Sequence, residues 1–91
     1  MNPDTILRED NPRASQTDLT VYLDALTIYV EAADNVRRNG AICSHPRTGT
    51  PMDNPYLKVM ASASAVFRKY PKIKSDRALA EVTNALNRSQ P

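Results

Sequence analysis

The segment from Leu19 to Arg38 constrains the fold of this chain more than any other. Its apolar residues recur every three or four positions and so form a stripe along a helix. A second stripe lies beside the first, and together they exceed the roughly 100° that faces a core from one side. The first stripe is Leu19, Tyr22, Leu26, Tyr29, Ala33 and Val36, and the second is Val21, Ala25, Ile28 and Ala32. We therefore expect this helix to be covered on two sides.

The short length of the chain decides what can cover the second side. Its 91 residues make one small domain, and a domain of this size buries only somewhat over ~60% of its unfolded surface. Oligomerisation is one common way for such a domain to gain stability. We predict that another copy of the chain covers the second stripe. The predicted oligomer interface is Val21, Ala25, Ile28 and Ala32.

Composition divides the chain into an arm, one domain and a tail. Residues 1–16 are polar, contain two prolines and show no period, which predicts a flexible arm or a segment docked on a neighbour. A single helical domain is expected over 17–87 and a frayed tail over 88–91. No apolar run approaches the ~18 residues of a membrane span, and a single cysteine, Cys43, cannot form an internal disulfide. These features predict a soluble protein of a reducing cytoplasm.

Start and stop signals place the remaining elements. The long helix begins after a capping Thr17 or Asp18 and ends before Gly40, a residue suited to helix ends. Asn54-Pro55 is a helix entrance, because proline suits the first helical turn. The predicted elements after Gly40 are short strands over 41–43 and 50–52, a turn over 45–49, a helix over 55–70 ended by Pro71, and a short helix from Ser75 to Leu86. The predicted fold is mostly α, with two main antiparallel helices linked by a short β-hairpin and a short C-terminal helix.

Few residues are suited to catalysis or to metal binding. Cys43 and His45 are the only metal-like pair, and zinc requires four ligands that the chain lacks. Gly40 and Gly49 are its only glycines, too few for a glycine-rich phosphate loop. We expect no metal, no cofactor and no enzymatic activity.

Basic residues point instead to an anionic partner. The first 35 residues carry seven carboxylates and two arginines, whereas the remaining 56 carry ten cations and three carboxylates. Lysine and arginine side chains of this kind contact DNA phosphates without reading sequence. The alternative is an ordinary charged surface, with cations stabilising helix ends. The candidate DNA-binding residues are Arg37, Arg38, Arg47, Arg68, Lys69 and Lys72, with Lys74 beside them.

The order and spacing of these parts resemble the phage terminase small subunits. The matching residues are Tyr29, Ala33 and Val36, then Asn39-Gly40, Gly49, Asn54-Pro55-x-Leu57, Ala63, Phe67 and Ser75-x-Arg77. Two departures are the short segment before the long helix and Pro71-Lys72-Ile73-Lys74 where the family has a Gly-Leu stretch.

This resemblance implies a non-enzymatic, ring-forming component of the DNA-packaging machine. Such proteins engage viral double-stranded DNA and hand it to the large terminase subunit, which holds the ATPase and the nuclease. The protein would act in the host cytoplasm and be absent from the mature virion. The alternative function is a helical protein–protein adaptor that never touches DNA.

Overall fold

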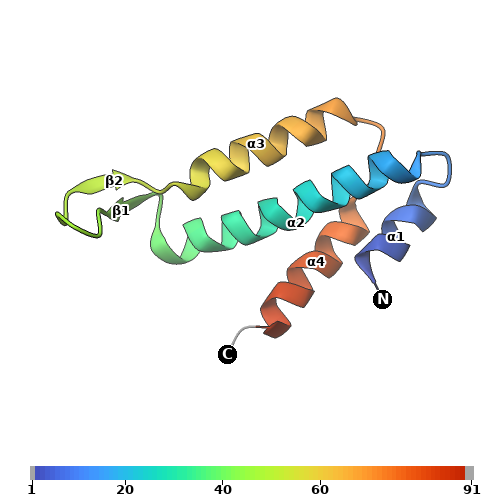
Figure 1. Cartoon of the computed structure of the whole chain (residues 1–91). Coiled ribbons are helices and arrows are strands. Elements are labelled where there is room, and N and C mark those ends of the chain that lie inside the picture. Colours follow the sequence, from blue (N-terminus) through green and yellow to red (C-terminus); the bar gives the residue numbers. More distant parts are fainter. Residues whose placement is uncertain (1, 90–91) are drawn as a thin grey trace.

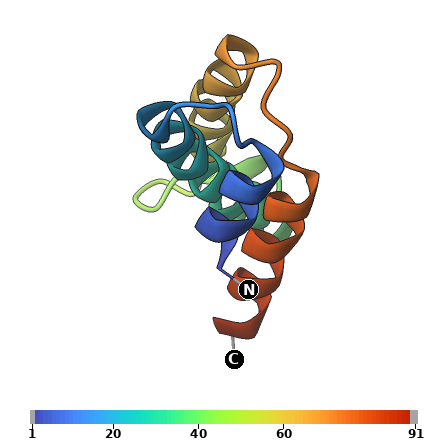
Figure 2. The ribbon, with the colours of Figure 1, turned by 90° about the vertical axis from the view of Figure 1, so that its right-hand side faces the viewer.

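The computed structural model describes residues 2–89, which form four helices and one two-stranded hairpin. The long helix α2 lies between α3 on one flank and the pair α1 and α4 on the other (Figures 1 and 2). The helices α2 and α3 run antiparallel, and the hairpin projects from the end where they join (Figure 1). The elements are α1 (Pro3–Asp10), α2 (Gln16–Asn39), β1 (Ile42–Ser44), β2 (Pro51–Asp53), α3 (Tyr56–Lys69) and α4 (Asp76–Ser89).

The core includes the first half of the predicted apolar stripe of α2, Leu19, Tyr22 and Leu26, together with Val30, which belongs to neither predicted stripe. Its aromatic centre joins α2 to α3, because the rings of Tyr22 and Phe67 lie 5.1 Å apart and those of Tyr29 and Phe67 lie 5.6 Å apart. The Tyr22 hydroxyl shares a 3.0 Å hydrogen bond with the Ser75 hydroxyl at the start of α4. Each large apolar side chain buried here contributes about 1.5–3 kcal/mol. The buried residues of the core are Ile6, Leu7, Leu19, Tyr22, Leu26, Val30, Ala78 and Val82.

Helix α1 corrects the prediction of a flexible arm over residues 1–16. Asn2 caps this helix by accepting the Asp4 amide (2.8 Å), and Pro3 occupies its first turn. Its apolar residues Ile6 and Leu7 are buried, and Leu7 is 0% exposed. Eight residues make barely two helical turns, too few to show a period. Such a short helix depends on tertiary packing.

Polar contacts between distant residues hold α1 against α4. Asn11 donates from its side chain to the Lys74 carbonyl (2.8 Å) and accepts the Lys74 amide (2.7 Å). Arg77 of α4 pairs with Asp10 at 2.6 Å and approaches Glu9 at 3.8 Å. Helix α4 continues to Ser89, beyond the predicted end at Leu86, and residues 90 and 91 of the predicted tail lie outside the described residues.

A buried asparagine joins α2, the hairpin and α3. Asn54 is 2% exposed. Its amide nitrogen donates to Asn35 Oδ1 (3.1 Å) and to the Gly40 carbonyl (2.9 Å). Its side-chain oxygen accepts the Tyr56 amide (2.9 Å), and its backbone amide donates to the Ala41 carbonyl (2.8 Å). The predicted helix entrance is therefore confirmed, and the same side chain also fixes the end of α2.

The hairpin is confirmed, with strands one residue later than predicted. Its antiparallel register pairs Ile42 with Asp53 and Cys43 with Met52. Gly49 completes the turn with a positive φ of 71°, a conformation that favours glycine. Within residues 2–89, no helix is both long and apolar enough to cross a membrane.

We predict that Asn54→Ala lowers the free energy of unfolding by about 1–3 kcal/mol, because it removes a buried side chain that bonds the Gly40 carbonyl and the Tyr56 amide. Chemical denaturation measures the change. The control is Asn84→Ala at an exposed position of α4, where we expect a change within about 0.5 kcal/mol. Equal changes in the two variants would show that Asn54 does not hold this junction.

Candidate assembly groove and nucleic-acid interface

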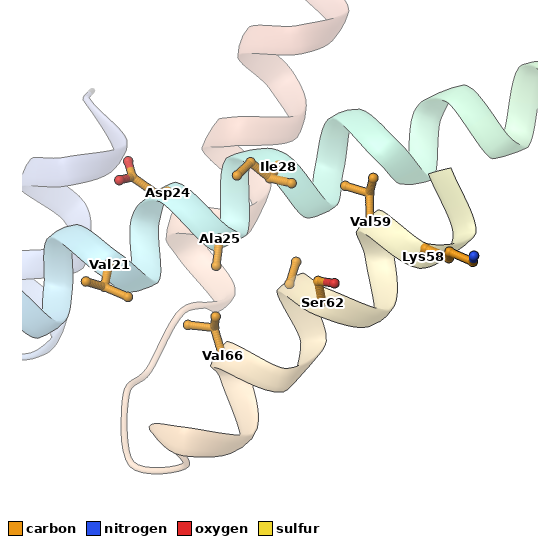
Figure 3. Close-up of a pocket in the computed structure, with 9 residues that line it drawn as sticks. Val21, Asp24, Ala25, Ile28, Lys58, Val59, Ser62 and Val66 are labelled. Carbon is orange, nitrogen blue, oxygen red and sulfur yellow. The ribbon is translucent and has the colours of Figure 1, made fainter. Parts of the chain in front are cut away.

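An apolar groove runs between α2 and α3 (Figure 3). Its volume is about 520 Å³, and its walls are almost entirely apolar. Val21 and Ile28 remain 42% and 47% exposed in the single chain, and both line this groove, so their exposed surface belongs to one apolar patch. Two charged residues, Asp24 and Lys58, lie toward opposite ends of the groove (Figure 3). The lining residues are Val21, Asp24, Ala25 and Ile28 of α2 and Lys58, Val59, Ser62, Ala63 and Val66 of α3.

Three of the four residues predicted as an oligomer interface line this groove. Val21 and Ile28 present open apolar surface, and Ala25 forms part of the floor. Ala32 is 0% exposed in the single chain, so its side chain offers no surface to another subunit. The second stripe of α2 is therefore covered by the chain itself near Ala32 and left open near Val21 and Ile28.

The α3 wall of the groove is absent from the predicted interface. Its members Val59, Ala63 and Val66 recur every three or four residues and so form an apolar stripe along α3, and Ser62 lies beside them. The apolar spacing along α3 was the signal that could have found this wall. The interface was predicted from the periodicity of α2 alone, whereas α2 and α3 form the groove together.

The basic residues predicted to bind DNA divide into two groups at opposite ends of the α2–α3 pair. Because these helices run antiparallel, the C-terminus of α2 lies beside the hairpin and the C-terminus of α3 lies at the far end (Figure 1). The hairpin-end cluster is Arg37, Arg38 and Arg47, and the turn-end cluster is Arg68, Lys69, Lys72 and Lys74. The 14 residues of α3 separate the clusters by about 20 Å.

A carboxylate holds two members of the hairpin-end cluster. Asp34, only 7% exposed, pairs with Arg37 and, at 3.1 Å, with Nε of Arg38. Both arginines keep much of their surface exposed, so their guanidinium groups stay accessible while the carboxylate offsets one of their charges. The third member, Arg47, lies exposed in the hairpin turn.

The pair Cys43 and His45 sits in the hairpin and at its turn. Both residues are half-buried, and His45 Nδ1 accepts the Arg47 amide at 3.1 Å. Within the described part of the chain, no three histidine, cysteine or acidic side chains come together as a metal site would require.

Comparison with known families decides the family of the chain. The model of the phage terminase small subunit matches residues 5–72. The chain belongs to this phage terminase small-subunit family. Searches among curated proteins and among solved structures gave no match.

The matched region confirms the resemblance and extends it toward the N-terminus. It begins within α1, ahead of the long helix where the sequence resemblance starts, and ends in the turn after α3. The segment interpreted as an arm is thus part of the terminase small-subunit region. The groove and nearly all of both basic clusters lie within residues 5–72, whereas Lys74 and α4 follow it.

We predict that Asp34→Asn lowers the free energy of unfolding by about 1 kcal/mol, because a neutral amide cannot form charge-assisted hydrogen bonds to Arg37 and Arg38. Urea denaturation at low salt measures the loss. Glu31→Gln, at an exposed position of the same helix, is the control and should change stability by less than about 0.5 kcal/mol. Indistinguishable denaturation curves for the two variants would contradict the role of Asp34.

Proposed function

We propose that this chain is the small subunit of a phage terminase, which assembles into an oligomeric ring, engages viral double-stranded DNA and hands it to the large terminase subunit. The observation that carries the proposal is the family match over residues 5–72. In this role the chain contributes no catalysis and regulates the ATPase and nuclease of its partner. It acts in the cytoplasm of the infected host, where packaging takes place.

The groove supports the assembly part of this proposal. Exposed contiguous apolar surface on a small domain marks an interaction site, and Val21 and Ile28 expose such surface beside the floor of the groove. Small residues there, Ala25, Ser62 and Ala63, leave room for a side chain or a helix of a neighbouring copy. Covering this groove in an oligomer would also add the buried area that a chain of 91 residues lacks.

The double variant Val21→Ser/Ile28→Ser is expected to shift the protein toward monomer, because two aliphatic side chains no longer contribute to the contact. Sedimentation velocity at matched concentrations measures the shift. The control Ile42→Ser alters the most exposed large aliphatic residue outside the groove, 58% exposed in the hairpin, and should sediment like the unmodified chain. Unchanged sedimentation of the double variant would remove the groove from the assembly.

The basic clusters support the DNA part of the proposal. Lysine and arginine side chains that neutralise phosphates release bound counterions, so the affinity falls as salt rises. We expect the logarithm of the affinity for a short duplex to fall linearly with the logarithm of the salt concentration. Fluorescence anisotropy with a labelled duplex measures this dependence. An affinity that does not change between low and moderate salt would contradict phosphate contacts.

The second candidate function is a helical protein–protein adaptor without DNA binding. The separation of the basic residues into two clusters favours it, since one continuous basic surface would be the stronger sign of a DNA-binding protein. The two functions differ in one measurement. An adaptor keeps its assembly through the groove and shows no affinity for duplex DNA at low salt.

A further inference from the structure

We propose that the turn-end cluster, and not the hairpin-end cluster, is the surface that contacts the phosphates of duplex DNA. This inference rests on the proposed function and narrows it to one end of the α2–α3 pair. It follows from three features of the described residues: the charges beside each cluster, the exposure of its members, and the way the backbone beneath it is held.

The hairpin-end cluster carries partly compensated charge. Asp34 pairs with both Arg37 and Arg38, and Asp53 lies on β2 beside the same junction. Asp34 therefore offsets one of the three positive charges of this cluster. A phosphate that drew the two arginines away would weaken the ion pairs of a nearly buried carboxylate, which is costly in a poorly solvated site. Arg37 and Arg38 are consequently less available to DNA phosphates than cations that form no ion pair.

The turn-end cluster carries uncompensated charge. Arg68, Lys69, Lys72 and Lys74 are all exposed, and none forms an ion pair with another described residue. The nearby carboxylates of α1 are already engaged, because Arg77 pairs with Asp10 and approaches Glu9. Asp76, at the start of α4, is the carboxylate that follows the cluster in the sequence. Four cations lie within seven residues here, with their charge directed to solvent.

The backbone beneath the turn-end cluster is anchored on both sides of Lys72. The side chain of Asn11, which is buried, bonds both the amide and the carbonyl of Lys74. On the other side, the ring of Tyr70 packs edge-on against Tyr22 with centroids 6.4 Å apart, and the Ile73 amide donates to the Tyr70 carbonyl at 3.2 Å.

This anchoring favours binding. The backbone of the turn is already ordered, so binding costs mainly the rotamer freedom of the lysine and arginine side chains. Contacts of this kind position a protein on DNA and carry no sequence information. We therefore assign the turn-end cluster the role of binding the phosphates of the duplex, regardless of base sequence.

Two triple variants with the same change in net charge test the proposal. Lys69→Gln/Lys72→Gln/Lys74→Gln removes three charges from the turn-end cluster, and Arg37→Gln/Arg38→Gln/Arg47→Gln removes three from the hairpin-end cluster. Anisotropy of a labelled duplex is recorded across a salt series. Each lost phosphate contact reduces the salt slope by roughly 0.9, so the turn-end variant should lose roughly 2 to 3 in slope and the hairpin-end variant less than about 1.

Single variants cover the case in which removing Arg37 and Arg38 unfolds the chain. Lys72→Gln and Arg47→Gln each remove one charge from an exposed turn, and neither residue forms an ion pair with another described residue. Only Lys72→Gln should lower the slope, by roughly 0.9. Circular dichroism and light scattering establish that fold and assembly are kept.

The outcomes separate this inference from the proposed function. A larger loss of slope in the turn-end variants supports the inference. Equal losses at the two ends, or a larger loss at the hairpin end, overturn it while leaving the DNA-binding function intact. An unmodified chain without salt-dependent affinity for duplex DNA overturns the DNA-binding function itself, and the inference with it.

Discussion

The fold depends on the hydrogen bonds of one buried asparagine. Asn54 bonds the carbonyl of Gly40 at the end of α2 and the amide of Tyr56 at the start of α3, while its backbone closes the hairpin on Ala41. These contacts turn the chain back so that α3 runs antiparallel along α2. The groove exists because the two helices lie side by side, and the basic clusters lie apart because their C-termini face opposite ways. Both candidate functional surfaces therefore follow from this junction.

The sequence was sufficient to predict the elements whose signals are local. The hairpin, the Asn54-Pro55 entrance and the end of the long helix were all predicted within one residue of their observed bounds. The start was not: Ser15 caps α2 in place of the predicted Thr17 or Asp18, so the helix begins two to three residues earlier than expected. Helix α1 was not predicted, because its partners are far away in the chain: Asn11 bonds Lys74 across 63 positions, and Arg77 reaches Asp10 across 67. The basic residues were identified one by one from the sequence. Their separation into two clusters follows from the antiparallel packing of α2 and α3, which is tertiary structure and has no local sequence signal. The α3 wall of the groove was missed for a different reason: its apolar spacing is a local signal, but the interface was predicted from α2 alone.

Some of the carboxylates in the acidic N-terminal part form ion pairs with cations of the basic C-terminal part in the same chain. Arg77 of the basic part forms ion pairs with Glu9 and Asp10 of the acidic part and so holds α4 against α1. Asp34 of the acidic part likewise forms ion pairs with Arg37 and Arg38 of the basic part. What stays available for partners is the turn-end cluster and the apolar groove, which lie on one scaffold of two helices. The proposed function uses both kinds of surface, the groove for other copies of the chain and the turn-end cluster for DNA.

The assembly of the unmodified chain is the most direct test, since the proposed function has a second copy of the chain cover the groove between α2 and α3. Static light scattering at micromolar concentration measures the mass in solution without any substitution. We expect a particle whose mass is a whole-number multiple of the 10.1 kDa chain, and at least twice that value. A single species of 10.1 kDa at these concentrations would contradict it.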